Sequence, residues 1–213
     1  VNRYQSWIPT SNAEIEVMIS TLSAGLTSDS IRLEAVFSPW HLGGDLLISS
    51  SHTLEIMPNV ELSLAPDAGL TVEGQLLVND AWIGGTASGG ISANDGGNIQ
   101  MISTLYSGGP ISVGDNGEAS LASMTISDAP VSVSGTGTLA IIDGTISQTD
   151  ICIRATGTLN LHGTQIENCG MYAMWATDAS LWVENAIIGA GSSNGAWIQQ
   201  GSGTLSGWNT SDY

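Results

Sequence analysis

The chain of 213 residues contains no lysine and three arginines, Arg3, Arg32 and Arg154, against 20 aspartates and glutamates. Its formal net charge at pH 7 is −17. Nucleic acids and anionic membrane surfaces are recognised through clusters of basic side chains, which this sequence lacks. The composition therefore excludes nucleic acid as a partner, and its acidity favours an extracellular or cell-surface setting.

Long apolar segments are absent as well. No stretch approaches the roughly 18 consecutive apolar residues of a membrane-spanning helix, so we expect no membrane insertion. The chain begins Val1-Asn2-Arg3 without the basic and then apolar regions of a signal peptide, and we expect none in this chain. Helical periodicity is scarce, and residues 20–34 are the one stretch that favours a short helix.

A repeated phrase is present instead. A turn with a small residue precedes an apolar, a polar and a second apolar residue, as in Gly137-Thr-Leu139-Ala-Ile141 and Gly157-Thr-Leu159-Asn-Leu161. The leading residues are Ile99, Leu121, Leu139, Leu159, Leu181 and Leu205, at spacings of 22, 18, 20, 22 and 24 residues. Such drift is typical of a solenoid whose turns vary in length.

Each repeat carries two further apolar markers. An isoleucine follows the leading residue by seven positions at Ile146, Ile166 and Ile188, whereas Ile126 follows Leu121 by five. A third alternating segment occurs at Ile111–Val113, Val131–Val133, Ile151–Ile153, Tyr172–Met174 and Ala196–Ile198. Three short strands per rung of 18–24 residues predict an all-β fold, a single-stranded parallel β-helix with three sheets. Stacked rungs would form one continuous core.

The segment from Gly44 to Leu76 resembles the opening rungs of right-handed parallel β-helix proteins of the pectate-lyase-like superfamily. The resemblance is carried by Gly43-Gly44-Asp-Leu46-Leu-Ile48, Thr53-Leu54-Glu-Ile56-Met-Pro58-Asn-Val60 and Leu70-Thr-Val72-Glu-Gly74-Gln-Leu76. It extends over residues 41–205 and implies a β-helix domain at 41–213. Residues 1–40 do not match and are expected to form an N-terminal cap or linker. The superfamily includes lyases, hydrolases, adhesins and surface proteins, so the fold does not select a function.

Inward positions of a β-helix are packed, so a site must lie on an outward strand face or in the turns. When the rungs are aligned on their leading residues, Asp143, His162 and Glu184 fall in one column. The two carboxylates would then be about 9–10 Å apart on either side of the histidine. This is near the upper end of the separation in inverting glycosidases, about 6.5–9.5 Å. A loose metal site and plain solvent-facing polar residues are the alternatives.

Tryptophans gather on two outward faces. Trp182 follows Asn160 on one face, and Trp175 and Trp197 lie near Arg154 on another, at positions that match Ser134 and Cys152. Exposed tryptophans indicate a contact site, and sugar rings stack on such faces. The alternative is that loops or a neighbouring chain cover them. The predicted ligand-binding residues are Trp175, Trp182, Trp197, Arg154 and Asn160.

Turns rich in Asp, Asn and Gly, such as Asp115-Asn116-Gly117-Glu118, offer ligands for Ca²⁺, although none has the signature of a known Ca²⁺ loop. We assign no metal site and expect no required cofactor, with Ca²⁺ as a possible ligand. A polar column, Asp128, Gln148 and Asn168, follows the central isoleucines and is expected to be structural.

The two cysteines are predicted to be free thiols. Cys152 is expected to point outward from a strand. Cys169 aligns with Thr149, three residues earlier in its rung. Three extended residues span about 10 Å, which is beyond the reach of a disulfide, about 7 Å between Cα atoms.

The catalytic sets of the superfamily's enzymes are missing. Its lyases depend on Arg and Lys, whereas Arg154 is the one basic residue within the rungs, and Leu161-His162-Gly163 only weakly resembles the Gly-His-Gly motif of its hydrolases. The sequence favours a non-catalytic extracellular or cell-surface module that is structural, adhesive or carbohydrate-contacting, with a polysaccharide or another surface protein as partner. One alternative is a polysaccharide-active enzyme, a hydrolase rather than a lyase, that uses the carboxylate and histidine column. Another is an oligomer or filament subunit whose tryptophans are buried between chains.

Overall fold

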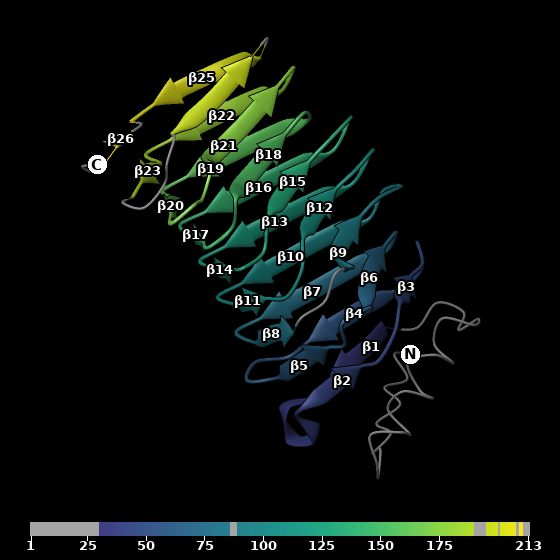
Figure 1. The fold of residues 1–213 in the computed structure, drawn as a ribbon. Coiled ribbons are helices and arrows are strands. Elements are labelled where there is room, and N and C mark those ends of the chain that lie inside the picture. Colours follow the sequence, from purple (N-terminus) through teal and green to yellow (C-terminus); the bar gives the residue numbers. More distant parts are fainter. Residues whose placement is uncertain (1–29, 86–88, 190–194, 200, 208, 211–213) are drawn as a thin grey trace.

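The structure is a computed structural model that describes residues 30–85, 89–189, 195–199, 201–207 and 209–210. The chain forms a right-handed solenoid of three parallel sheets and about eight turns. Figure 1 shows the turns stacked along one axis from the N-terminal to the C-terminal end. The 3₁₀ helix η1 (Ala35–Phe37) is the one helical element among the described residues. The predicted three-sheet parallel β-helix is confirmed.

The strands fall into three sheets, here called A, B and C, and each rung contributes one strand to each sheet. Sheet A contains β1 (Ser30–Leu33), β4 (Thr53–Ile56), β7 (Gln75–Asn79), β10 (Asn98–Ile102), β13 (Glu118–Ala122), β16 (Thr138–Ile142), β19 (Thr158–His162), β22 (Ser180–Glu184) and β25 (Ser202–Ser206). Sheet B contains β2 (Trp40–Leu42), β5 (Glu61–Leu64), β8 (Trp82–Gly85), β11 (Leu105–Ser107), β14 (Thr125–Ser127), β17 (Thr145–Ser147), β20 (Gln165–Glu167), β23 (Ile187–Ile188) and β26 (Asn209–Thr210). Sheet C contains β3 (Leu46–Ile48), β6 (Gly69–Val72), β9 (Gly90–Ala93), β12 (Ile111–Val113), β15 (Val131–Val133), β18 (Ile151–Ala155), β21 (Tyr172–Thr177) and β24 (Ala196–Gln199).

The core consists of columns of apolar side chains that run along the solenoid axis. Alternate residues of a strand point to opposite faces, and parallel in-register pairing places each inward residue on its equivalent in the next rung. One column of sheet A contains Ile56, Val78, Met101, Leu121, Ile141, Leu161 and Val183. The column of sheet B contains Leu62, Ile83, Tyr106, Ile126, Ile146, Ile166 and Ile188. All of these side chains are buried.

Tyr106 interrupts this aliphatic column with a polar group. Its hydroxyl donates a hydrogen bond to the carbonyl of Gly108 at 2.7 Å, which satisfies the buried donor. Burial raises the pKa of Tyr106 far above its usual range, so the hydroxyl stays protonated.

The register corrects two of the leading residues of the repeat. Ile99 pairs with Ala119 rather than with Leu121, and Leu181 pairs with Gly203 rather than with Leu205. The corrected column is Leu76, Ile99, Ala119, Leu139, Leu159, Leu181 and Gly203, at spacings of 20 to 23 residues. Ile126 then follows Ala119 by seven positions, as the other isoleucines follow their leading residues.

A residue in the left-handed backbone conformation follows the strands of sheet A from β7 onward. This column contains Asp80, Ser103, Ser123, Asp143, Gly163, Asn185 and Gly207, with φ between 46° and 61°. Each of its first six N–H groups donates to a carbonyl of the following rung, as Asp143 does to His162 at 2.8 Å. The types suit the conformation, because Gly, Asn and Asp tolerate it best. Asp128, Gln148 and Asn168, the polar column expected to be structural, are left-handed as well.

The N-terminal end is built from β1, η1 and β2. β1 is the first strand of sheet A, so the solenoid begins within the segment that the sequence assigns to a cap or linker. The helix expected within residues 20–34 is wrong for the described part, which is strand from Ser30 to Leu33. Residues 1–29 lie outside the described residues. Phe37, in η1, packs edge-on against the buried Trp40 ring at 6.2 Å.

The prediction of two free thiols is wrong, because Cys152 and Cys169 form a disulfide with a Cα–Cα distance of 5.8 Å. Cys152 is buried rather than outward. Residues 148–150 bend rather than continue as extended strand, and the Thr149 hydroxyl donates to the Ile151 carbonyl at 2.8 Å. The corner between sheets B and C is also wider in these rungs. Ile153 and Met174 are the register counterparts of Val131; they follow Ile146 and Ile166 by seven and eight residues, whereas Val131 follows Ile126 by five.

Reduction of the disulfide is expected to lower the free energy of unfolding by about 3 kcal/mol, because the crosslink closes a loop with a sequence separation of 17. Guanidinium denaturation with and without a reductant measures the difference. The variant with both Cys152→Ala and Cys169→Ala should match the reduced protein and should not respond to the reductant. A reductant-insensitive wild-type midpoint would contradict the crosslink.

Two serine-to-glycine substitutions three residues apart are expected to differ in effect. Ser123 has a left-handed φ of 52°, a conformation that costs a non-glycine residue about 1–2 kcal/mol. Ser123→Gly removes this cost, and the gain offsets the loss of about 0.5–1 kcal/mol that the flexibility of glycine causes. Ser120→Gly, in strand β13, carries the flexibility cost alone. Denaturant unfolding should show Ser123→Gly at or above wild-type stability and Ser120→Gly below it. Equal losses for the two variants would contradict the role of the turn conformation.

Candidate functional site

The outer face of sheet C carries one continuous column of outward residues. In register, it contains Ser92, Ser112, Ser132, Arg154, Trp175 and Trp197. Small hydroxyl side chains therefore occupy the middle rungs, and a cation and two indoles occupy the C-terminal rungs. Because stacked strands lie about 4.8 Å apart, these groups form a narrow strip parallel to the solenoid axis.

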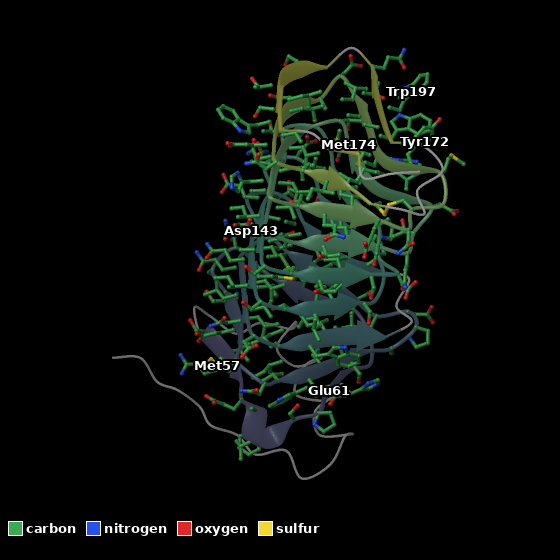
Figure 2. The ribbon with its side chains drawn as sticks, turned by 90° about the vertical axis from the view of Figure 1, so that its left-hand side faces the viewer. Met57, Glu61, Asp143, Tyr172, Met174 and Trp197 are labelled. Carbon is green, nitrogen blue, oxygen red and sulfur yellow. A yellow bond between two sulfur atoms is a disulfide. The ribbon has the colours of Figure 1, made fainter. Side chains whose placement is uncertain are left out.

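Four side chains at the C-terminal end of this strip, Arg154, Tyr172, Trp175 and Trp197, form what we call the aromatic platform. The ring centroids of Tyr172 and Trp175 are 5.2 Å apart, and each ring lies 6.4 Å from Trp197. The interplanar angles are between 49° and 78°, as expected for favourable edge and tilted contacts. Figure 2 shows Tyr172 and Trp197 side by side at the end of the solenoid. The Trp175 indole N–H donates to the Thr177 hydroxyl at 3.1 Å.

The guanidinium of Arg154 lies over the Trp175 ring, with Cζ 5.7 Å from the ring centroid. Such an exposed cation–π contact contributes about 0.5–1 kcal/mol. Among the described residues Arg154 forms no salt bridge, whereas Arg32 Nε lies 2.8 Å from Glu55 Oε2. Its donors therefore face solvent in a chain of net charge −17, beside an aromatic ring.

The platform is open to solvent, and the disulfide lies at its base. Trp197 is 48% exposed and Arg154 is also exposed, while Tyr172 and Trp175 are partly buried. Cys152 is two residues before Arg154 in β18, and Cys169 precedes Tyr172 by three. The crosslink therefore ties together the two segments that present the cation and the tyrosine.

The structure corrects the register of the tryptophans predicted on this face. Trp175 pairs with Arg154 and with Trp197, and Arg154 pairs with Ser132. The two tryptophans therefore continue the column of Ser132 and Arg154, not that of Ser134 and Cys152. The predicted alignment of Trp182 with Asn160 is confirmed, because the two residues pair on the outside of sheet A. Trp182 is 57% exposed, but it belongs to another sheet and is not part of the platform.

The predicted column of Asp143, His162 and Glu184 is formed only in part. His162 pairs with Glu184 across β19 and β22, and its Nδ1 lies 3.4 Å from Glu184 Oε2, with both side chains about half exposed. Asp143 is displaced by one residue, because His162 pairs with Ile142. Asp143 belongs to the left-handed column of the turn instead, where its carboxylate occupies the space beside Gly163.

Side chains that could coordinate a metal ion do not cluster in the part of the chain that is described. No group of three or more His, Cys, Asp or Glu side chains there is arranged to hold a metal ion. Among the turns considered for Ca²⁺, the Asp115 carboxylate accepts a hydrogen bond from the Thr136 N–H at 3.0 Å in the next rung. The possibility of Ca²⁺ binding stays a prediction.

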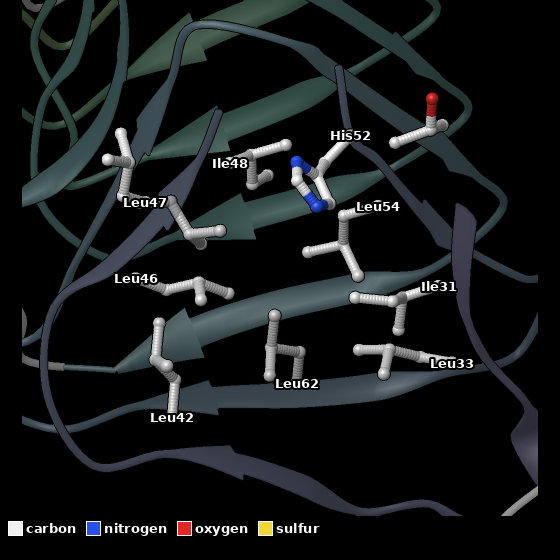
Figure 3. Close-up of a pocket in the computed structure, with 11 residues that line it drawn as sticks. Ile31, Leu33, Leu42, Leu46, Leu47, Ile48, His52, Leu54 and Leu62 are labelled. Carbon is white, nitrogen blue, oxygen red and sulfur yellow. The ribbon is translucent and has the colours of Figure 1, made fainter. Parts of the chain in front are cut away.

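A pocket at the N-terminal end was not found from the sequence. It is lined mainly by leucine and isoleucine from all three sheets, namely Ile31, Leu33, Leu42, Leu46, Leu47, Ile48, Leu54, Leu62 and Leu70, together with His52 and Thr53. The His52 ring lies near Ile48 and Leu54 in Figure 3. Its Nδ1 is 2.6 Å from the Ser49 hydroxyl, and its Nε2 is buried with no hydrogen-bond partner among the described residues. Nothing in the pattern Ser51-His52-Thr53 signals this environment.

Tyr172 is the member of the platform that sequence reasoning missed. It appears in the sequence as the first residue of an alternating strand segment, and its ring contacts depend on the wide corner between sheets B and C. Ala173 and Met174 are both buried, so Tyr172 lies on the outer side of β21 with Trp175, which strict alternation along a strand does not predict.

The part of the chain that the structure describes contains no helix long and apolar enough to cross a membrane. The sequence matches no protein-family profile and no curated protein. Among solved structures, the chain is similar to the mannuronan C-5 epimerase AlgE4 A-module from Azotobacter vinelandii, with 10% sequence identity and a TM-score of 0.30. The match covers 97% of this chain and 94% of that one. The parallel β-helix fold follows from the three parallel sheets of this chain itself.

Proposed function

We propose that this chain is a non-catalytic extracellular or cell-surface module that contacts carbohydrate through the aromatic platform. The observation that carries the proposal is the open cluster of Tyr172, Trp175 and Trp197 with Arg154 beside it. Apolar rings left in water cost free energy unless a partner covers them. A sugar ring offers an apolar face for the indoles and hydroxyls for the guanidinium.

The shape of the surface favours an extended ligand. The hydroxyls of Ser132, Ser112 and Ser92 continue the column of Arg154 along successive rungs. A glycan chain that stacks on the platform could therefore run along the axis of the solenoid and exchange hydrogen bonds with these hydroxyls. The net charge of −17 repels polyanions, so we expect neutral glycans to bind better than acidic ones.

The disulfide supports the proposed location. Disulfides persist in oxidising compartments and are rare in the reducing cytosol. The Cys152–Cys169 crosslink lies in the middle of the C-terminal half and ties together the segments that carry the platform. A module with this bond is suited to the extracellular space or to a cell surface, in agreement with its acidity.

Replacing Trp197 by alanine is expected to weaken glycan binding at least tenfold, because it removes the most exposed ring of the platform. A tenfold change corresponds to about 1.4 kcal/mol. A panel of neutral and acidic glycans identifies a ligand, and titration of tryptophan fluorescence measures its affinity.

Trp182→Ala is the matched control, since it removes an equally exposed indole from sheet A and should leave the affinity unchanged. If no glycan of the panel binds or changes the fluorescence, the carbohydrate part of the proposal is wrong. Equal losses in the two variants would show that the site is not the platform.

The contact between His162 and Glu184 favours a second candidate function, that of a polysaccharide hydrolase. A carboxylate beside Nδ1 orients an imidazole, and a histidine held in this way can serve as a general base. Arg154 lies on a different sheet from this pair, and Arg32 lies in the first rung, where it pairs with Glu55, which does not favour lyase chemistry.

If the chain degrades a glycan, Glu184→Gln is expected to lower the turnover by about 10²–10⁴-fold, the usual contribution of a positioned proton-transfer group. Release of reducing ends from the same glycan panel measures the turnover, and Glu167→Gln on sheet B serves as a control of equal chemistry. A wild-type protein that releases no reducing ends from any glycan removes the enzymatic candidate.

A further inference from the structure

The last rung differs from all earlier ones in the exposure of its inward residues. Ile198 follows Ala176 in a core column of sheet C, and Leu205 follows Val183 in a core column of sheet A. Ala176 and Val183 are fully buried, whereas Ile198 is 41% exposed and Leu205 is 51% exposed. Two apolar columns of the core therefore reach the C-terminal face of the solenoid without a further described strand to cover them.

The same face presents open strand edges. β24, β25 and β26 are each the last strand of their sheet, so one row of their N–H and C=O groups faces no further described strand. Protein edges of this kind are usually protected by charges or by proline. Residues 196–206 contain neither, although the last strand of sheet A, β25, is five residues long.

The charge distribution sets this face apart from the rest of the chain. The run from Asn185 to Ser211 contains no Asp, Glu, Lys or Arg and is the longest uncharged run in a sequence with 20 acidic residues. Two bodies of net charge −17 repel each other, and the repulsion is weakest where neutral surfaces meet. The C-terminal face is therefore the surface through which two copies can approach.

The N-terminal face does not offer a complementary surface. Its inward residues Leu33, Leu42 and Ile48 are no more than 5% exposed, and Trp40 is buried under η1. Charged side chains, among them Arg32 and Glu55, stand beside it. A head-to-tail stack would join this covered, charged N-terminal face to the open, neutral C-terminal face. The two faces are not complementary, so this arrangement is disfavoured.

We propose that the C-terminal face, formed by Ala196–Gln199 and Ser202–Ser206, is a self-association surface at which two copies of this chain meet tail to tail. A two-fold axis at this face reverses strand direction, so β25 of one copy lies antiparallel to β25 of the other. Leu205 and Ile198 of each copy then pack against the partner's core columns. An interface of this kind is closed, which yields a dimer rather than a filament. The proposal goes beyond carbohydrate contact: it rests on Ile198 and Leu205, whereas the platform uses Trp197, which shares strand β24 with Ile198.

Sedimentation of the full chain over a range of concentrations tests the proposal. The wild-type chain is expected to show twice its monomer mass of 21.9 kDa. Leu205→Asp and, in another sheet, Ile198→Asp each place two like charges in the interface, so both variants should sediment as monomers. Leu105→Asp is the matched control, because Leu105 is 53% exposed on the outer face of sheet B and lies outside the interface. This variant should remain a dimer.

A wild-type chain that stays monomeric at the highest concentration overturns the proposal, and so does a dimer that survives Leu205→Asp and Ile198→Asp. A mass that grows with concentration beyond the dimer would indicate a head-to-tail filament and would overturn the two-fold arrangement. Circular dichroism of each variant shows whether the β-helix is retained. Glycan binding is read from the titrations with Trp197→Ala and Trp182→Ala, and self-association is read from the sedimentation mass, so failure of one proposal is distinguishable from failure of the other.

Discussion

In-register parallel pairing is the constraint on which the rest of this structure depends. Every described strand bonds to the equivalent strand of the preceding or following rung, so each residue has its own counterparts as neighbours. Any residue added to a rung must be taken up in a turn, because a slip of one position would turn the apolar face outward. The left-handed residue that follows each sheet A strand from β7 onward is part of this mechanism. Its N–H bonds to the next rung and holds the corner in the same place from turn to turn.

The corner between sheets B and C shows what happens when rung length changes. The rungs that contain Ile146 and Ile166 place two or three extra residues there, while the sheets keep their register. The extra residues fold back on themselves, bring Cys152 to Cys169 and place Tyr172 beside the column of Arg154 and Trp175. The disulfide and the platform therefore have a common origin in one local departure from the repeat.

Much of this was predictable from the sequence, and the errors share a physical cause. A strand pattern with a period of two marks the inward face but does not distinguish one inward column from the next. The pattern therefore assigns Leu121 and Leu205 to the column that in the structure contains the small residues Ala119 and Gly203. The pairing of Trp182 with Asn160 followed from counting along regular strands. Positions near turns failed, since counting cannot anticipate a left-handed residue at Asp143 or a folded corner before Cys152.

The last described rung of the solenoid links the aromatic platform to the proposed dimer. A rung is stabilised by the neighbours on its two sides, and the last described rung has a neighbour on one side only. That rung carries Trp197, the most exposed ring of the platform, on β24. A weakly held β24 would present Trp197 in many orientations, and a ligand would have to restrict them at a cost in affinity. In the proposed dimer the second copy supplies the missing neighbour, so association at the C-terminal face would order β24 and pre-form the surface on which a sugar ring stacks. The same contact would place two platforms on one particle, which strengthens binding to a repeating glycan without any new contact to the sugar.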